Sequence, residues 1–94
     1  MEDFAQSIQH DQETGKFIYE QDGKHSYLTY TIDGDAMDFQ HTYVPPALRG
    51  QSIASKIVRY GLEYAQKHGY KVNPSCPFVA SYMNQHSEFD GIRV

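Results

Sequence analysis

The chain has 94 residues, enough for one folded domain with a modest core and too few for two. Hydrophobic residues make up 39% of the sequence and aromatic residues 14%, a composition typical of folded rather than disordered proteins. The formal net charge is −4 and no Lys/Arg cluster occurs, which argues against a nucleic-acid-binding protein.

The sequence also limits the compartment in which the protein works. Its single cysteine, Cys76, excludes an intramolecular disulfide and suits a reducing environment. The first residues, 1–4, lack the apolar stretch of a secretion signal, and no apolar run approaches the length needed to span a membrane. We therefore expect a monomeric cytoplasmic protein with neither a membrane nor a nucleic-acid partner.

The first half of the chain has the alternating pattern of antiparallel strands. We expect strands over 7–10, 16–20 and 39–44, with a further strand between the last two. The pairs Asp22-Gly23 and Asp33-Gly34 are flanked by β-forming residues, and each predicts a tight hairpin turn. These signals predict an antiparallel meander.

The two turns together predict how the strands align. If each is a two-residue loop, Leu28 pairs with Phe17 on one side and with Phe39 on the other. The same register places His41 at the edge of the apolar face. That face then collects the large apolar side chains of the meander, Phe17, Tyr19, Leu28, Tyr30, Met37 and Phe39.

A loop of small residues connects the last of these strands to a helix. Pro45 and Pro46 cannot donate ladder hydrogen bonds, so strand pairing must stop there. Residues 49–54 then lead directly into helical periodicity. A helix start leaves backbone N–H groups unpaired, and its dipole favours anions. A phosphate or pyrophosphate would suit such a helix start, but on the glycine alone an ordinary strand-to-helix connection is the preferred interpretation.

The second half of the chain predicts a helix, a strand and a second helix. The first helix spans about 51–68, and Gly61 within it indicates a close contact between helix and sheet. Residues 70–73 then form a short strand, which a right-handed crossover places parallel to the strand before the loop. A second helix covers 77–86, with proline in its first position.

Several motifs in this order resemble the small single-domain branch of the GNAT acetyltransferase superfamily. Residues 49–54 resemble its pyrophosphate loop, with Ser52 at the position of the pattern's middle glycine. The longer patterns are His41-Thr42-x-Val44-Pro45, Leu48-Arg49-Gly50-Gln51 and Pro74-x-Cys76-Pro77-Phe78-Val79-Ala80-x-Tyr82. The resemblance covers about 8–89 and implies one domain, 1–94, with a minimal GNAT fold of class α+β. Such a fold has an antiparallel meander, one parallel crossover strand, a central helix and a C-terminal helix.

The resemblance implies transfer of an acetyl group from acetyl-CoA to an amine that the sequence does not identify. In this superfamily the strand before the loop separates from the last strand, and the pantetheine arm of CoA lies in the gap. Backbone groups of 41–44 would then hold the arm and polarise the thioester carbonyl, while the loop holds the pyrophosphate. The expected CoA-binding residues are Thr42, Tyr43, Val44, Arg49, Gly50, Gln51, Ser52, Ile53 and Ala54.

Three residues are candidates for catalysis. Cys76 precedes the predicted second helix, whose dipole lowers a thiol pKa; the alternative is a small, inert core residue. His41 has the chemistry to accept the amine proton, although strand histidines are also structural residues. The resemblance places Tyr82 near the superfamily's general-acid tyrosine, and packing is the alternative. The remaining histidines have no metal-site spacing, so we predict no metal.

Two other functions stay open at this stage. The chain has no room for the helices and closing strands that usually shape the acceptor site. Without an acceptor site of that kind, the chain would be a protein that binds CoA or acetyl-CoA with vestigial or no transfer activity. A plain nucleotide-phosphate binder is the third possibility, but neither Gly-x-x-x-x-Gly-Lys-Ser/Thr nor Gly-x-Gly-x-x-Gly occurs.

Overall fold

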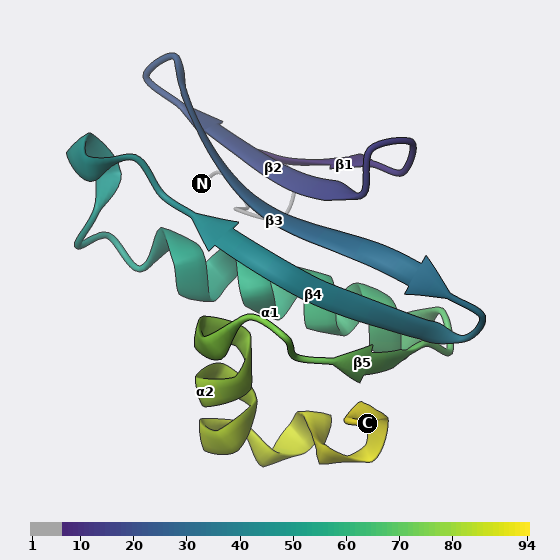
Figure 1. The fold of residues 1–94 in the computed structure, drawn as a ribbon. Helices are drawn as coiled ribbons and strands as arrows, with labels where there is room; N and C mark the ends of the chain where they lie inside the picture. Colours follow the sequence, from purple (N-terminus) through teal and green to yellow (C-terminus); the bar gives the residue numbers. More distant parts are fainter. Residues whose placement is uncertain (1–6) are drawn as a thin grey trace.

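The computed structural model describes residues 7–94, which form one five-stranded sheet with a long helix across one face (Figure 1). The strand order is β1-β2-β3-β4-β5; all neighbours are antiparallel except β4 and β5, which are parallel. The strands are β1 (Ile8–Asp11), β2 (Lys16–Gln21), β3 (Lys24–Asp33), β4 (Ala36–Tyr43) and β5 (Lys71–Asn73). The helices are η2 (Pro46–Leu48), α1 (Ile53–Lys67), α2 (Pro77–Gln85) and η3 (Ser87–Ile92). The predicted α+β fold class is confirmed.

The first hairpin has the predicted register and the second does not. Phe17 pairs with Leu28 as expected. Asp33, however, pairs with Ala36, so the loop is Gly34-Asp35, with Gly34 in the left-handed region at φ 62°. The prediction that Leu28 pairs with Phe39 is therefore wrong. Near the turn, the observed pairing of β3 with β4 differs from the predicted pairing by two residues. A shift of two residues leaves each side chain on its predicted face of the sheet, so Phe39 still faces the core.

A β-bulge in β4 then reverses that alternation. Tyr30 pairs with Phe39, but its neighbour Thr29 pairs with His41, which leaves Gln40 as the extra residue. Beyond the bulge, His41 is exposed and Thr42 turns toward the core. The expectation that His41 lies at the edge of the apolar face is wrong, because the sequence pattern contained no sign of the bulge.

The core lies between the sheet and α1. Five of the six predicted core-face residues of the meander are buried, Tyr19 being only partly so. Gly61 lies at a close contact between α1 and the sheet, as predicted. A Cβ atom there would lie 3.0 Å from Leu28 Cδ2 and 3.2 Å from Phe39 Cε2. The inner face of α1 is buried along its length, with Ile53, Ile57, Val58, Gly61, Leu62 and Ala65.

No helix in residues 7–94 is long and apolar enough to cross a membrane. The face of the sheet opposite α1 carries Tyr27, Thr29, Gln40, His41 and Tyr43, and we call it the open face because no described helix lies over it (Figure 1). The end of the chain returns to β5, where Val72 forms an isolated parallel bridge with Arg93.

Candidate functional site

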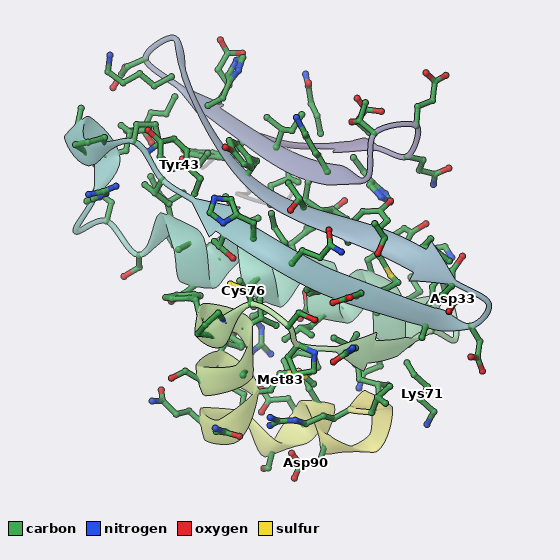
Figure 2. All side chains as sticks on the ribbon, in the orientation of Figure 1. Asp33, Tyr43, Lys71, Cys76, Met83 and Asp90 are labelled. Carbon is green, nitrogen blue, oxygen red and sulfur yellow. The ribbon has the colours of Figure 1, made fainter. Side chains whose placement is uncertain are left out.

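Strands β4 and β5 stay paired for only three residues and then separate. The paired segment of β4 is 36–38. One further link follows, from the Cys76 amide to the Phe39 carbonyl at 2.8 Å. Beyond it β4 continues to Tyr43, whereas the chain after β5 turns into α2 (Figure 2). The separation of these two strands that the family resemblance implies is therefore present.

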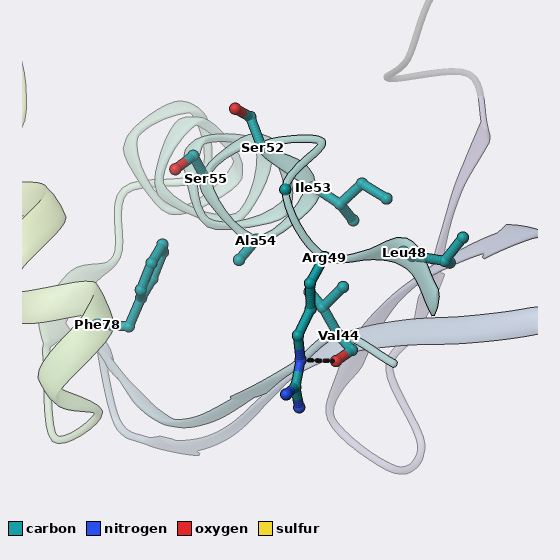
Figure 3. Close-up of a pocket in the computed structure, with 9 residues that line it drawn as sticks. Val44, Leu48, Arg49, Ser52, Ile53, Ala54, Ser55 and Phe78 are labelled. Carbon is teal, nitrogen blue, oxygen red and sulfur yellow. Dashed lines mark hydrogen bonds between the residues drawn. The ribbon is translucent and has the colours of Figure 1, made fainter. Parts of the chain in front are cut away.

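A loop leads the chain from the end of β4 into α1. Gly50 and the N-cap residue Ser52 both have left-handed φ angles, 87° and 61°. In the described part of the chain the Ser52 side chain makes no capping hydrogen bond. The first N–H groups of α1 therefore receive no side-chain cap from Ser52, and they lie at the positive end of the helix dipole. The Arg49 Nε donates to the Val44 carbonyl at 3.0 Å and ties the loop to the end of β4 (Figure 3).

Two hollows lie beside this loop and share part of their lining. One, of about 170 Å³, is bounded by 48–50, 52–55, Val44 and Phe78. The other, of about 260 Å³, extends along the end of β4. The residues that line both are Val44, Arg49, Ala54 and Phe78. We call the two together the loop groove; it runs from the start of α1 to Thr42.

Cys76 lies beyond the Thr42 end of the groove. It is buried and is the N-cap residue of α2, as predicted, with Pro77 in the first helical position. Its sulfur lies 3.5 Å from the Thr42 hydroxyl oxygen. Burial by itself raises the pKa of the thiol, but the Thr42 hydroxyl and the backbone N–H groups of Phe78, Val79 and Thr42 outweigh it, so the pKa is lowered from its usual value.

Tyr82 contacts a different part of the molecule. Its hydroxyl accepts a hydrogen bond from Arg59 Nη1 at 3.2 Å, and its ring stacks on His86 with centroids 3.8 Å apart. The same Arg59 nitrogen lies 3.1 Å from Glu88, so this arginine joins α1 to α2 and η3. Tyr82 is not among the residues that line the groove. These contacts favour the packing alternative for Tyr82.

The structure brings most of the predicted residues together and separates three from the groove: Gln51, His41 and Tyr82. The groove is lined by Thr42, Tyr43, Val44, Arg49, Gly50, Ser52, Ile53 and Ala54. Gln51 instead accepts a hydrogen bond from Gln21 on β2 at 3.2 Å. His41 is on the open face, with its ring 6.2 Å from that of Tyr27. Cys76 and His41 therefore lie on opposite faces of β4.

Sequence reasoning missed three lining residues, Leu48, Ser55 and Phe78. Phe78 belongs to the Cys-Pro-Phe pattern, and its position two residues after the N-cap was the available signal. Among residues 7–94 no group of three or more His, Cys, Asp or Glu side chains could hold a metal ion.

The mixed five-stranded sheet, with its parallel crossover through α1, has the architecture of a GNAT-type domain. The sequence profile of the GCN5-related N-acetyltransferase family matches residues 16–92, and the chain belongs to that family. Two similar proteins are Protein NATD1 of Gallus gallus and of Homo sapiens. Each is 28% identical over 82 residues, covering 84% of this chain and 74% or 73% of the relative.

A solved structure shares the fold. The NMR solution structure of a GCN5-like protein from Staphylococcus aureus superimposes with a TM-score of 0.73 at 22% sequence identity. The match covers 93% of this chain and 86% of the other. At that identity the comparison establishes the fold.

Proposed function

We propose that this protein is a cytoplasmic N-acetyltransferase that moves an acetyl group from acetyl-CoA to an amine. The observation that carries the proposal is the loop groove. At one end, N–H groups at the start of α1 provide a site for the pyrophosphate. At the other end, the strand gap holds Thr42 and Cys76. A pantetheine arm is the part of acetyl-CoA that joins a pyrophosphate to a thioester.

The chemistry requires attack by a neutral amine on the thioester carbonyl, with cleavage of the carbon–sulfur bond. Backbone N–H groups of 42–44 stabilise the developing oxyanion. The departing thiolate needs a proton, and the Cys76 thiol beside Thr42 can donate one. In a two-step route, Cys76 would instead attack first and carry the acetyl group to the amine. The lowered pKa of its thiol suits either role.

The amine then approaches from the other side of β4. His41 lies on the open face, so it accepts the amine proton there while Cys76 acts on the groove side. This arrangement gives the two residues separate tasks. It makes the open face the acceptor side.

The proposal is tested by NMR titration of the labelled protein with acetyl-CoA, CoA and ATP. CoA and acetyl-CoA should shift amides of 41–44 and 49–54, and ATP should shift fewer of them. Changes confined to the η3 tail or to the hairpin turns would contradict the proposed site. Mass spectrometry of a panel of amines, incubated with enzyme and acetyl-CoA, then tests the transfer.

The second candidate is a protein that binds CoA or acetyl-CoA without transferring the acetyl group. It is favoured by the open face, since no described element encloses an amine beside His41 (Figure 1). Specific shifts with CoA, together with no acetylated product from any amine of the panel, would identify this function. Product formation that is lost in Cys76→Ala would exclude it.

A further inference from the structure

The loop groove has little positive charge for a ligand with several phosphate groups. Arg49 is the one charged side chain among the residues that line it, and its Nε is already bonded to the Val44 carbonyl. The chain as a whole has a formal charge of −4. Long-range electrostatics therefore oppose the approach of CoA, and backbone N–H groups supply the main local attraction for phosphate.

The middle of the groove is apolar by contrast. Val44, Ala54 and Phe78 line both of its hollows. Phe78 is 41% exposed, and its ring points toward the first turn of α1 (Figure 3). The other exposed large hydrophobic residues of the described chain are Ile32 and Val94, and neither lines this groove. Phe78 is thus an uncovered aromatic surface in a concave site, where a ligand would remove it from water.

The position of Phe78 along the groove selects the part of the ligand that it meets. The phosphate-binding N–H groups lie on the loop side, and the Thr42–Cys76 pair lies on the other. The adenosine of CoA lies beyond the pyrophosphate, outside the interval between these two ends. The pantetheine arm lies within it.

We propose, on the basis of the proposed function, that Phe78 is the residue that makes this site selective for the pantetheine arm. The ring packs against the arm from the α2 side, while β4 backbone groups bind its amides from the other. The arm, and not the nucleotide, then supplies most of the affinity for CoA.

Calorimetric titrations of wild type, Phe78→Ala and Phe78→Leu test this inference. The probes are CoA, pantetheine, and adenosine 3′,5′-bisphosphate, which lacks the arm. Phe78→Ala should weaken CoA and pantetheine about tenfold, the loss expected for apolar area of this size, and leave the bisphosphate unchanged. Phe78→Leu should keep most of the affinity. Ile32→Ala, a substitution of a similarly exposed side chain outside the groove, should change nothing.

The outcomes separate this inference from the proposed function. If wild type binds CoA but Phe78→Ala binds it equally well, the inference is wrong and the proposed function stands. An equal loss for pantetheine and the bisphosphate would also overturn it, because the side chain would then act on the whole groove. If wild type binds neither CoA nor pantetheine, the proposed function itself fails. A second readout is the dependence of CoA affinity on ionic strength. If contacts with the pantetheine arm supply most of the affinity, it should not fall as ionic strength rises; if the phosphates supply it, it should fall.

Discussion

The Thr42 hydroxyl oxygen lies 3.5 Å from the Cys76 sulfur and links β4 to the start of α2 at the point where β4 and β5 separate. The contact depends on the β-bulge at Gln40. Without that extra residue, Thr42 would face the open side of the sheet and His41 the core side. One inserted residue thus decides which side chain of β4 meets the cysteine.

We expect Cys76 to be more reactive than an ordinary thiol. Burial raises its pKa, but the Thr42 hydroxyl and nearby backbone N–H groups lower it further than burial raises it. Wild type should react with iodoacetamide near neutral pH, and CoA in the groove should protect it. Thr42→Val should slow the reaction severalfold at pH 7 and shift its pH profile upward, while Thr42→Ser should preserve both.

Cys76 also distinguishes an acetyltransferase from a protein that only binds CoA. Cys76→Ala should reduce acetyl transfer at least a hundredfold with little change in CoA affinity, because binding uses backbone groups and Phe78. Mass spectrometry after incubation with acetyl-CoA would show whether Cys76 carries the acetyl group. A slowly reacting, unprotected cysteine whose removal changes neither activity nor binding would be a packing residue.

Tyr82→Phe should affect stability more than activity. The substitution removes the hydroxyl that accepts the Arg59 hydrogen bond, at an expected cost of about 1 kcal/mol in the free energy of unfolding. Acetyl transfer should stay within a few-fold of wild type. A large fall in the rate at unchanged stability would instead support the general-acid role that the family resemblance implies for Tyr82.

The order of elements was predictable from sequence because each boundary has a local chemical cause. Two prolines end β4, Pro77 starts α2, and Gly61 marks where α1 meets the sheet. The bulge was not predictable, since it depends on how two strands fit together and no glycine or proline marks Gln40. The location of His41 followed from that bulge and was therefore missed.

The residues that line the candidate site were predictable to a similar extent. The loop residues 49–54 stand in a linear motif, and the structure places most of them around one groove. Phe78 was missed because its exposure depends on tertiary packing. From sequence alone, a phenylalanine near the start of a helix is expected to be a core residue.

Ser52→Gly should stabilise the protein and leave CoA binding unchanged or tighter. Ser52 has a left-handed φ of 61°, which costs a side-chain-bearing residue roughly 1 kcal/mol relative to glycine. Its hydroxyl makes no capping bond within the described residues that the substitution would remove. Urea unfolding and a CoA titration measure the two effects. Weaker CoA binding by the glycine variant would mean that the hydroxyl itself contacts phosphate.

Gly61→Ala should destabilise the fold by about 1 kcal/mol or more despite the higher helix propensity of alanine. The new methyl group would lie 3.0 Å from Leu28 and 3.2 Å from Phe39, and both of those side chains are fully buried. Neither can move aside without disturbing its neighbours. Urea unfolding measures the change. Ala65, one turn further along α1, is a buried alanine, so the inner face of the helix accommodates a methyl group at that position. A variant more stable than wild type would show that the core side chains can rearrange to accommodate the methyl group.

The last prediction concerns stability below neutral pH. His10 stacks on Phe17 with ring centroids 4.2 Å apart, and its Nε2 is hydrogen-bonded to the Tyr30 hydroxyl. Burial lowers the pKa of His10 below 6.5, His68 lowers it further, and Asp11 acts in the opposite direction. Above about pH 6.5 the histidine is neutral in both the folded and the unfolded chain, so its contribution to stability is complete.

As the pH falls below that value, the unfolded chain takes up the proton first, and stability is lost until the pH passes the pKa of the folded state. The loss from His10 should be small, because the side chain is only partly buried and solvent screens the charge that it takes up. Urea unfolding of wild type and His10→Gln between pH 7.5 and pH 5 measures it. The variant should be less stable at pH 7.5, because it lacks the ring stack, and should lose less on acidification. Parallel curves for wild type and His10→Gln would show that His10 titrates alike in the two states.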